Sequence, residues 1–274
     1  MNPVPALFSA AAGAGGLCID DVSFAYRDEP VLRRVTLAVP EGQFVSLLGP
    51  SGSGKSTLLR LIAGLEKPTR GRIAWKGVEI SGPGIDRAVV FQNYSLFPWF
   101  TAQANVALAV GKAHPDFTRA QRLALAREYL ARVGLAAAAE KYPLQLSGGM
   151  QQRAAIARAL ALEAPVLLMD EPFGALDPVN RGRLQDLLIE AWKNSSPRRT
   201  IIFVTHDIDE AVYLGDRVAL LGAGQGKRLL AEIDVSLPRP RPRAAFFASA
   251  QFRALREDIA ERLDADVISG LAAN

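Results

Sequence analysis

The sequence of 274 residues contains one cysteine, Cys18, and only two histidines. A single cysteine excludes an intramolecular disulfide and a cysteine-rich zinc site, and it fits a reducing compartment. No stretch reaches the roughly 18 uninterrupted apolar residues that a membrane-spanning helix requires. Internal repeats and long heptad runs are also missing. We therefore expect a cytosolic chain that does not cross a membrane.

A strong charge of one sign is missing as well. The 32 basic and 28 acidic residues leave a net charge of +4, and the isoelectric point is near 9.4. This excess is too small to require a nucleic-acid partner. The hydrophobic content of 49% is enough for a sizeable core, and the length allows one large domain or two small ones.

The N-terminal stretch Pro3–Leu17 is apolar and uncharged, but it lacks the basic region with which a secretory signal begins. We predict a loose extension over residues 1–16. From Leu17 the pattern changes to short β-type runs separated by turns, which favours antiparallel pairing. The predicted strands are Leu17–Tyr26, Val31–Val39, Gln43–Leu48, Gly71–Trp75 and Arg87–Phe91.

The third strand leads through a glycine-rich loop into a helical stretch, Lys55–Ala63, which is the order of a parallel α/β unit. Helical periodicity then dominates residues 93–164. Buried parallel strands are predicted at Pro165–Met169 and Thr200–Val204, with a helix over Val179–Lys193 between them. The predicted fold class is α/β, with a parallel-sheet core, an antiparallel β subdomain and a helical insertion.

The C-terminal tail begins with alternating proline and arginine, Pro238–Arg243, which should be extended and act as a linker. We expect Arg239, Arg241 and Arg243 to be solvated. Apolar residues from Phe252 to Leu263 predict one last amphipathic helix. The predicted domains are thus the extension 1–16, a main domain 17–237 with its helical subdomain at about 93–164, and a linker with a helix at 238–274.

The segment Gly49-Pro50-Ser51-Gly52-Ser53-Gly54-Lys55-Ser56 matches the phosphate-loop pattern G-x-x-x-x-G-K-[ST] between a predicted strand and a predicted helix. Its glycines let backbone N–H groups approach phosphate oxygens, and the helix N-terminus adds positive charge. Lys55 is expected to reach the β- and γ-phosphates, and the Ser56 hydroxyl to bind Mg²⁺. Thr57 is included in the predicted nucleotide site.

Two adjacent carboxylates, Asp170 and Glu171, end a predicted buried strand at the edge where α/β sheets bind ligands. Alone, such a pair is more often a solvated turn, but the phosphate loop favours a role in catalysis. Asp170 is placed to hold Mg²⁺, and Glu171 to act as the general base toward water. His206 follows another apolar strand and is predicted to reach the γ-phosphate, whereas His114 is expected to be structural.

The segment Leu146-Ser147-Gly148-Gly149 precedes a strongly helical stretch, with Ser147 as the N-cap. On local grounds it is either a capped helix after a turn or a second anion site. In the second case the Ser147 hydroxyl and the N–H groups of both glycines point at a phosphate.

Together, the phosphate loop, Leu-Ser-Gly-Gly, Asp170-Glu171 and His206 resemble the nucleotide-binding subunit of ATP-binding cassette (ABC) transporters. The resemblance covers residues 17 to 235. It implies a P-loop ABC ATPase fold, adenine stacking on Tyr26, and Gln92 linking Mg²⁺ and water to the helical insertion. It also implies that Asp177 belongs to a loop that crosses a dimer interface.

The resemblance further implies ATP and Mg²⁺ as cofactors and a homodimer or a pairing with a paralogous ATPase subunit, in which Ser147, Gly148 and Gly149 close over the partner's γ-phosphate. The segments 82–87 and 93–99 resemble the corresponding segments in importers of the nitrate, sulfonate and taurine group. The expected partners are integral membrane permease subunits and, indirectly, a periplasmic solute-binding protein, at the cytoplasmic face of a bacterial inner membrane. No nucleic-acid partner is expected.

The aromatic cluster, which we define as Phe97, Trp99 and Phe100 with Pro98 between them, lies where the family docks a short permease helix, although these rings could instead pack the helical insertion. Two alternatives share the nucleotide chemistry. One is an ABC ATPase that acts on nucleic acid or the ribosome, and the other is an exporter or regulatory ATPase. The transported solute is not specified by this chain.

Overall fold

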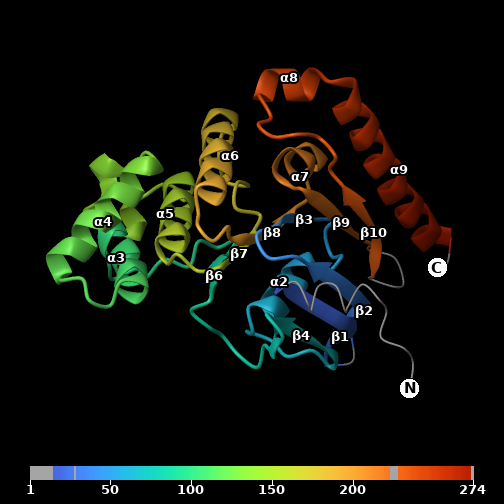
Figure 1. Cartoon of the computed structure of the whole chain (residues 1–274), viewed down its shortest axis with the longest axis horizontal. Coiled ribbons are helices and arrows are strands. Elements are labelled where there is room, and N and C mark those ends of the chain that lie inside the picture. Colours follow the sequence, from blue (N-terminus) through green and yellow to red (C-terminus); the bar gives the residue numbers. More distant parts are fainter. Residues whose placement is uncertain (1–14, 28, 223–227, 273–274) are drawn as a thin grey trace. The chain divides into compact units, whose positions relative to one another are not determined.

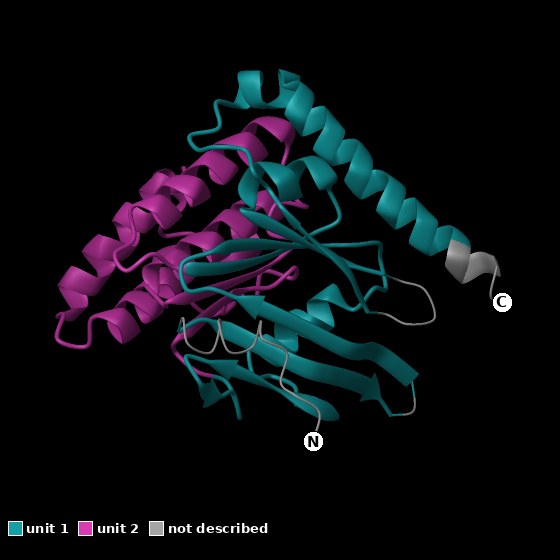
Figure 2. Ribbon diagram, turned by 45° about the vertical axis from the view of Figure 1, so that its right-hand side comes forward, with its two compact units in different colours: residues 1–83, 200–274 teal, residues 84–199 magenta. Residues whose placement is uncertain are grey.

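The computed structural model describes residues 15–27, 29–222 and 228–272, so most of the predicted N-terminal extension lies outside the described residues. The chain divides into two compact units (Figure 2). Unit 1 comprises residues 1–83 and 200–274, and unit 2 comprises residues 84–199. Among the described residues, no helix is long and apolar enough to span a lipid bilayer.

Unit 1 contains an antiparallel sheet with the strand order β2-β1-β4-β5 (Figure 1). Its strands are β1 (Leu17–Tyr26), β2 (Glu29–Val39), β4 (Arg70–Trp75) and β5 (Val78–Glu79). Apolar side chains alternate with less buried ones along β1: Leu17 and Ile19 are buried, and after a register shift so are Val22 and Phe24. Antiparallel pairing is confirmed for the predicted strands Leu17–Tyr26, Val31–Val39 and Gly71–Trp75, and β2 begins two residues earlier than predicted. The predicted strands Gln43–Leu48 and Arg87–Phe91 pair in parallel instead.

A second group of neighbouring strands in unit 1 has the order β10-β9-β3-β8. These are β3 (Phe44–Leu48), β8 (Thr200–Thr205), β9 (Arg217–Leu221) and β10 (Leu229–Asp234). β3 pairs in parallel with both β8 and β9, and all residues of β3 and β8 are buried. Continuous apolar runs are typical of such strands, because both faces of a parallel sheet are covered.

The helices of unit 1 are α2 (Lys55–Ile62), α7 (Ile208–Leu214), α8 (Arg243–Ala248) and α9 (Ala250–Ala272). α2 directly follows the phosphate loop, as predicted. The predicted last helix corresponds to α9, whose Phe252 and Ile259 are buried. α8 was not predicted, and it begins at Arg243, the last residue of the predicted extended linker.

Unit 2 contains the parallel pair β6 (Arg87–Val90) and β7 (Val166–Asp170), the helices of the insertion, and the separately predicted helix that follows β7. The helices are α3 (Ala102–Ala113), α4 (Arg119–Arg132), α5 (Gly148–Ala161) and α6 (Pro178–Lys193), with short 3-10 turns at Ala136–Ala138 and Pro143–Gln145. α4 ends at the C-cap Val133, and Gly134 follows with φ of 70°, the left-handed conformation that favours glycine after a helix.

Candidate functional site

The phosphate loop lies in unit 1 between the buried strand β3 and helix α2. Gly52 and Gly54 have φ values of 81° and 90°. A Cβ atom on Gly54 would approach Leu32 Cδ2 to 2.6 Å, and one on Gly49 would approach the Leu221 carbonyl oxygen to 2.2 Å. Glycine is therefore required here both for backbone conformation and for close packing.

Lys55 directs its ammonium group back toward this loop. Nζ donates hydrogen bonds to the carbonyl oxygens of Gly49 at 2.7 Å and Pro50 at 2.8 Å, and it lies 3.5 Å from Ser53 Oγ. Lys55 is only 5% exposed and Ser53 is fully buried. The loop thus holds a buried positive charge, which suits a site for an anionic ligand.

The other residues of the motif lie around this lysine. Ser51 is exposed and Pro50 is half-buried, while Ser56 and Thr57 are half-buried in the first turn of α2. The Ser56 hydroxyl therefore belongs to the helix that begins at Lys55, one residue beyond the buried ammonium. This is the position from which a hydroxyl can ligate a metal bound to the phosphates.

His206 and the phosphate loop follow paired residues on neighbouring parallel strands. Leu48 of β3 is in register with Thr205 of β8, so Gly49 and His206 are the next residues on the two strands. The carboxyl ends of parallel strands meet at one sheet edge. The structure thus brings the exposed His206 to the same edge as the phosphate loop.

Tyr26 lies at the end of β1 in the hairpin whose second strand contacts the loop. Its ring is 42% exposed and packs edge-to-face on Phe24, with a centroid distance of 4.8 Å. Leu32, the cross-strand partner of Phe24, is the residue that a Cβ on Gly54 would meet. An exposed ring at this position can stack on a planar base.

Gln92, Asp170 and Glu171 share an edge in unit 2. Val90 of β6 is in register with Met169 of β7, so Gln92 and Glu171 each lie two residues beyond this pair. Asp170 is 6% exposed, whereas Gln92 is exposed. Glu171 has φ of 45°, a strained conformation for a residue with a side chain, and such strain is common at functional sites.

The Leu-Ser-Gly-Gly segment begins α5 as predicted. Ser147 is the N-cap, and its Oγ accepts a hydrogen bond from Met150 N at 3.3 Å, while Leu146 is buried. A Cβ on Gly148 would lie 3.1 Å from the Tyr94 hydroxyl oxygen. The Ser147 hydroxyl proton is not used by this cap, because the hydroxyl acts there as the acceptor.

Asp177 is the N-cap of α6. It ends the loop that contacts the Leu-Ser-Gly-Gly segment, which we call the signature segment. Its carboxylate accepts hydrogen bonds from Asn180 N at 3.0 Å and Asn180 Nδ2 at 2.6 Å. These bonds lower the pKa of Asp177. In the same loop Leu176 Cδ2 and the Ala175 carbonyl oxygen lie 3.2 and 3.3 Å from a Cβ on Gly149. The loop and the signature glycines therefore pack together.

Sequence reasoning did not find the contacts that connect Gln92's loop to α5. Arg158 of α5 donates to the carbonyl oxygen of Ser95 at 2.7 Å and to that of Tyr94 at 3.5 Å, and its guanidinium lies 5.9 Å from the Phe97 ring centroid. Burial lowers the pKa of Arg158. Tyr94 and Ser95 both have positive φ, and no local sequence pattern predicts this backbone conformation.

The expectation that His114 is structural agrees with its surroundings. Its ring stacks on Phe117 at 4.5 Å, and Nε2 lies 3.5 Å from Glu163 Oε2. The predicted solvation is wrong for two of the three tail arginines: Arg241 is 7% exposed and the Arg239 side chain 14%, because both are bonded to backbone or carboxylate oxygens of residues 212–237. Arg243 is half-buried.

Comparison with known proteins gives a consistent result. Residues 32–174 match the model of the ABC transporter domain. The bicarbonate transport ATP-binding protein CmpD of Synechococcus elongatus is 44% identical over 244 residues, covering 88% of this chain and 87% of CmpD. CmpC of the same organism is 49% identical and NrtC, a nitrate import ATP-binding protein, is 47% identical, each over 228 residues and 83% of this chain.

The chain spans about a third of the length of CmpC and of NrtC, since the matched part is 34% of each. Among solved structures, the dimeric ATP-binding cassette MJ0796 matches with a TM-score of 0.73 and 34% sequence identity, covering 81% of this chain and all of that one. A post-hydrolysis dimer of MJ0796 bound to ADP and Pi matches with a TM-score of 0.72. The chain belongs to the ABC transporter family of ATP-binding proteins and has the α/β fold of its ATPase cassettes.

Proposed function

We propose that the chain is the ATP-hydrolysing subunit that powers the import of a small anion through separate membrane subunits. The observation that carries this proposal is the phosphate loop with Lys55 buried against its carbonyl oxygens, in a chain that also presents Ser147 at the start of α5. The phosphate loop suits binding of a triphosphate, and the N-terminus of α5 supplies a second set of groups for an anion.

ATP would lie with its phosphates in the loop Gly49–Ser56 and its adenine on the Tyr26 ring. On phosphate binding, the Lys55 ammonium would exchange carbonyl oxygens for β- and γ-phosphate oxygens. Magnesium fits the donor set, because Mg²⁺ prefers oxygen ligands and is usually held by one or two carboxylates together with substrate phosphates. Ser56, Asp170 and Gln92 would hold it, and it would neutralise charge on the transferring phosphoryl group.

Hydrolysis needs a base, and Glu171 is proposed for that role. Its carboxylate would accept a proton from the water that attacks the γ-phosphorus in line with the leaving β–γ bridging oxygen. His206 would contact the γ-phosphate from the β8 edge, and Gln92 would orient the water. When the cleaved phosphate leaves, His206 and Lys55 lose their contacts with it. The contacts in the site therefore differ before and after hydrolysis.

Two chains are proposed to form the working unit. Leu146, Ser147, Gly148 and Gly149 of one chain would close over the γ-phosphate bound to the other, and Asp177 would lie at the interface. The Ser147 hydroxyl proton is available for this contact because the cap bond uses only the oxygen. The chain would pair with itself or with a paralogous ATPase subunit, and the similar MJ0796 cassette is a dimer in both solved structures.

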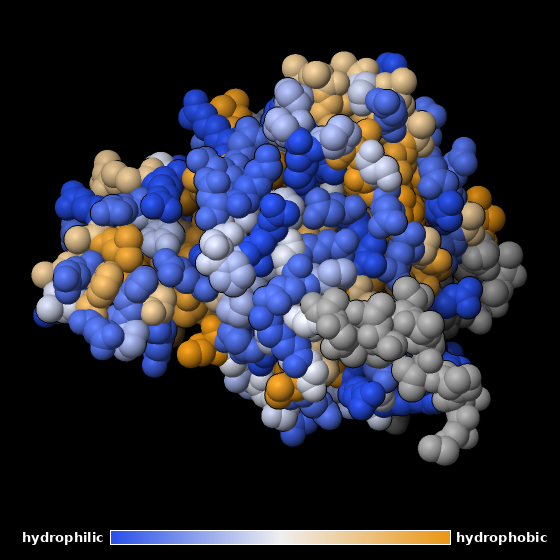
Figure 3. All heavy atoms as spheres, in the orientation of Figure 1, coloured by the Kyte–Doolittle hydropathy of each residue, from blue (hydrophilic) through white to orange (hydrophobic). Residues whose placement is uncertain are grey.

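The aromatic cluster is the proposed contact with the permease. Phe97 is 40% exposed, Trp99 66% and Phe100 36%, and their rings lie 5.6 to 6.3 Å apart. Phe100 also lines a pocket of about 410 Å³ between α3 and α4, with Leu108 and Leu123 in its wall. Apolar residues reach the surface among hydrophilic ones in this helical part of the chain, at the left of Figure 3. Such a site suits a short amphipathic helix.

The solute is proposed to be a small oxyanion, because the CmpC, CmpD and NrtC relatives are named for bicarbonate transport or nitrate import. Nitrate, sulfonate and taurine remain the predicted range. A periplasmic solute-binding protein would deliver the anion, and the chain would lie at the cytoplasmic face of the bacterial inner membrane. A nucleic-acid ATPase and an exporter are less favoured by these relatives.

The test uses a tagged Glu171→Gln chain, which should keep ATP affinity but lose nearly all turnover since only the base is removed. The variant is expressed in its native cell, and the membranes are solubilised with ATP. We expect the tagged chain to capture a polytopic membrane protein. We expect this capture to be lost when Trp99 and Phe100 are both replaced by serine. Unchanged kcat in Glu171→Gln would remove Glu171 from its role, and capture of nucleic acid or ribosomes instead would overturn the importer proposal.

A further inference from the structure

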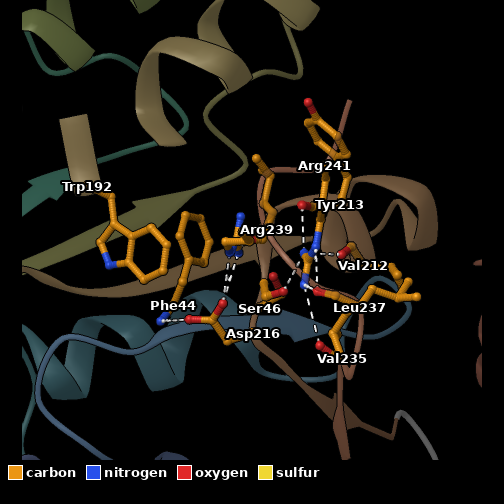
Figure 4. A network of polar contacts seen from close by, with 12 residues as sticks. Phe44, Ser46, Trp192, Val212, Tyr213, Asp216, Val235, Leu237, Arg239 and Arg241 are labelled. Atoms are coloured by element: carbon orange, nitrogen blue, oxygen red, sulfur yellow. Dashed lines mark hydrogen bonds and ion pairs between the residues drawn. The ribbon is translucent and has the colours of Figure 1, made fainter. Parts of the chain in front are cut away.

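The proline- and arginine-rich segment Pro238–Arg243 is part of the folded unit 1, and Arg241 is the most buried charged residue of this segment. Figure 4 shows its guanidinium directed at the end of α7. Nη1 donates to the carbonyl oxygens of Val212, Tyr213 and Gly215, each at 2.8 Å. Nε and Nη2 donate to the Leu237 carbonyl oxygen at 3.2 and 3.0 Å.

These contacts satisfy a requirement that α7 does not meet by itself. The last carbonyl groups of any helix lack intrahelical partners, and a basic side chain near the C-terminus commonly binds them. The α7 sequence, Ile208–Leu214, has no basic residue, and the helix has seven residues. Arg241 therefore supplies the cap from 29 residues beyond Val212.

The Arg241 guanidinium remains charged at neutral pH in this position. Burial and the neighbouring Arg239 lower its pKa to about 10, while Asp216 opposes the shift. The positive charge complements the negative end of the α7 dipole.

Arg239 and Arg243 extend the same contact. Arg239 Nε lies 3.0 Å from Asp216 Oδ1, and Arg239 also donates to the Leu214 carbonyl oxygen. The other oxygen of Asp216 accepts a hydrogen bond from Phe44 N at 3.1 Å, at the start of β3. The Arg243 guanidinium lies 4.4 Å from the ring centroid of Tyr213 in α7.

The N-terminal part of α7 is tied to the strand that carries His206. Thr205 Oγ1 donates to the buried Glu210 Oε2 at 2.6 Å and accepts from Asp207 N at 3.1 Å. Asp207 Oδ1 caps α7 by accepting from Glu210 N at 3.1 Å. His206 stands between Thr205 and Asp207, so its backbone position is set by the same bonds that fix the first turn of α7.

We propose that Arg241 is a positioning residue for His206. By capping α7, Arg241 holds in place the helix whose first turn fixes the backbone of His206. The segment Pro238–Arg243 thereby sets the rate of ATP turnover. The proposal rests on the proposed contact of His206 with the γ-phosphate. Arg256 of α9, the long helix beyond this segment, also contacts the first turn of α7: its Nε lies 2.7 Å from Asp209 Oδ1.

The experiment compares Arg241→Met, Arg241→Lys and Arg262→Met in the full chain. Arg262 is the matched control, because its exposed side chain pairs with Asp258 of the same helix and, among the described residues, with no carboxylate of α7. In Arg241→Met the amides of residues 206–214 should exchange hydrogen about tenfold faster, while those of α2 stay unchanged. Its kcat should fall at least about fivefold with KM for ATP within about twofold, since the phosphate loop is untouched.

Arg241→Lys keeps the charge with fewer donors and should lie between wild type and Arg241→Met in both measurements. It also keeps the test decisive if Arg241→Met does not fold. Unchanged exchange over residues 206–214, or faster exchange with unchanged kcat, would overturn the positioning role. His206→Ala is measured in parallel: if it keeps full kcat, the proposed role of His206 has failed, whereas the exchange result still decides whether Arg241 holds α7.

Discussion

Lys55 is the side chain on which the strength of nucleotide binding should depend most directly. Hydrogen bonds to charged groups contribute about 1.5–3 kcal/mol. Lys55→Ala should therefore weaken ATP binding by about tenfold to a hundredfold in equilibrium titration. Lys67→Ala removes an exposed lysine of the same unit and serves as the control. Equal affinity of the Lys55 variant and wild type would contradict the proposed nucleotide site.

Tyr129 gives the clearest pH dependence of a single residue. Burial, together with the hydrogen bond from its hydroxyl to Glu163 Oε1 at 2.9 Å, raises its pKa to about 12. The folded state holds this proton more tightly than the unfolded state, whose tyrosine pKa is about 10. The stabilising contribution is therefore complete below about pH 10 and is lost as the pH rises toward about 12.

The measurement is a titration of phenolate absorbance in wild type, Tyr129→Phe and Tyr142→Phe. A component near pH 12 should disappear only in Tyr129→Phe. Tyr142→Phe removes an exposed phenol and should leave that component in place. If all three proteins show the same late component, Tyr129 is not its source.

The predictions from sequence were most successful for residues whose roles depend on local order. Gly54 has a positive φ, as a glycine-rich loop allows, and Ser147 is the predicted N-cap, because neighbouring residues in the chain determine both features. Arg241 is the opposite case. The carbonyl oxygens of Val212, Tyr213 and Gly215, to which it donates, are more than 20 residues away, so an alternating Pro-Arg pattern alone gave no sign that it would be buried.

At the scale of an element, Asn105 organises the aromatic cluster from within α3. The side chain is fully buried, its Oδ1 accepts from Phe97 N at 2.8 Å, and its Nδ2 donates to the carbonyl oxygens of Phe97, Phe100 and Thr101 at 3.0 to 3.1 Å. Replacing it by leucine would remove the partner of Phe97 N and of the Phe100 carbonyl oxygen, while the carbonyl oxygens of Phe97 and Thr101 keep backbone donors. Each buried unpaired group costs about 1–3 kcal/mol.

We therefore expect Asn105→Leu to lower the free energy of unfolding by at least about 2 kcal/mol and to reduce permease capture. Urea denaturation measures the first effect. Gln251→Leu, which changes an exposed amide of α9, is the control and should stay within about 0.5 kcal/mol. A stable Asn105→Leu variant with a normal midpoint would show that the cluster is held by ring packing alone.

Long periodic elements were predicted well, and short elements were not. α4 and α6 show helical periodicity over many residues, and β7 and β8 are continuous apolar runs. β5 has two residues, and α7 and α8 have seven and six, so each is too short to show a period. α7 and α8 are instead stabilised by tertiary contacts such as Tyr213 with Phe246, whose ring centroids lie 5.3 Å apart.

At the scale of the whole molecule, the proposed mechanism places the two halves of each ATP site on different chains. The phosphate loop of one chain would need the α5 N-terminus of its partner. Two variants should then each be inactive alone for different reasons. Lys55→Ala disables the loop of its own chain, and Ser147→Arg blocks the signature segment that its own chain offers to a partner.

Mixing the two variants should restore activity, because a mixed dimer combines the intact loop of the Ser147→Arg chain with the intact signature segment of the Lys55→Ala chain. Random pairing makes half of the dimers mixed, each with one complete site, so about a quarter of wild-type ATPase activity is expected. Thr118→Arg, which removes the N-cap hydroxyl of α4, controls for loss of a cap and should be active alone. If the mixture stays as inactive as its components, the site is not completed by a partner chain, whereas recovery near a quarter requires that it is.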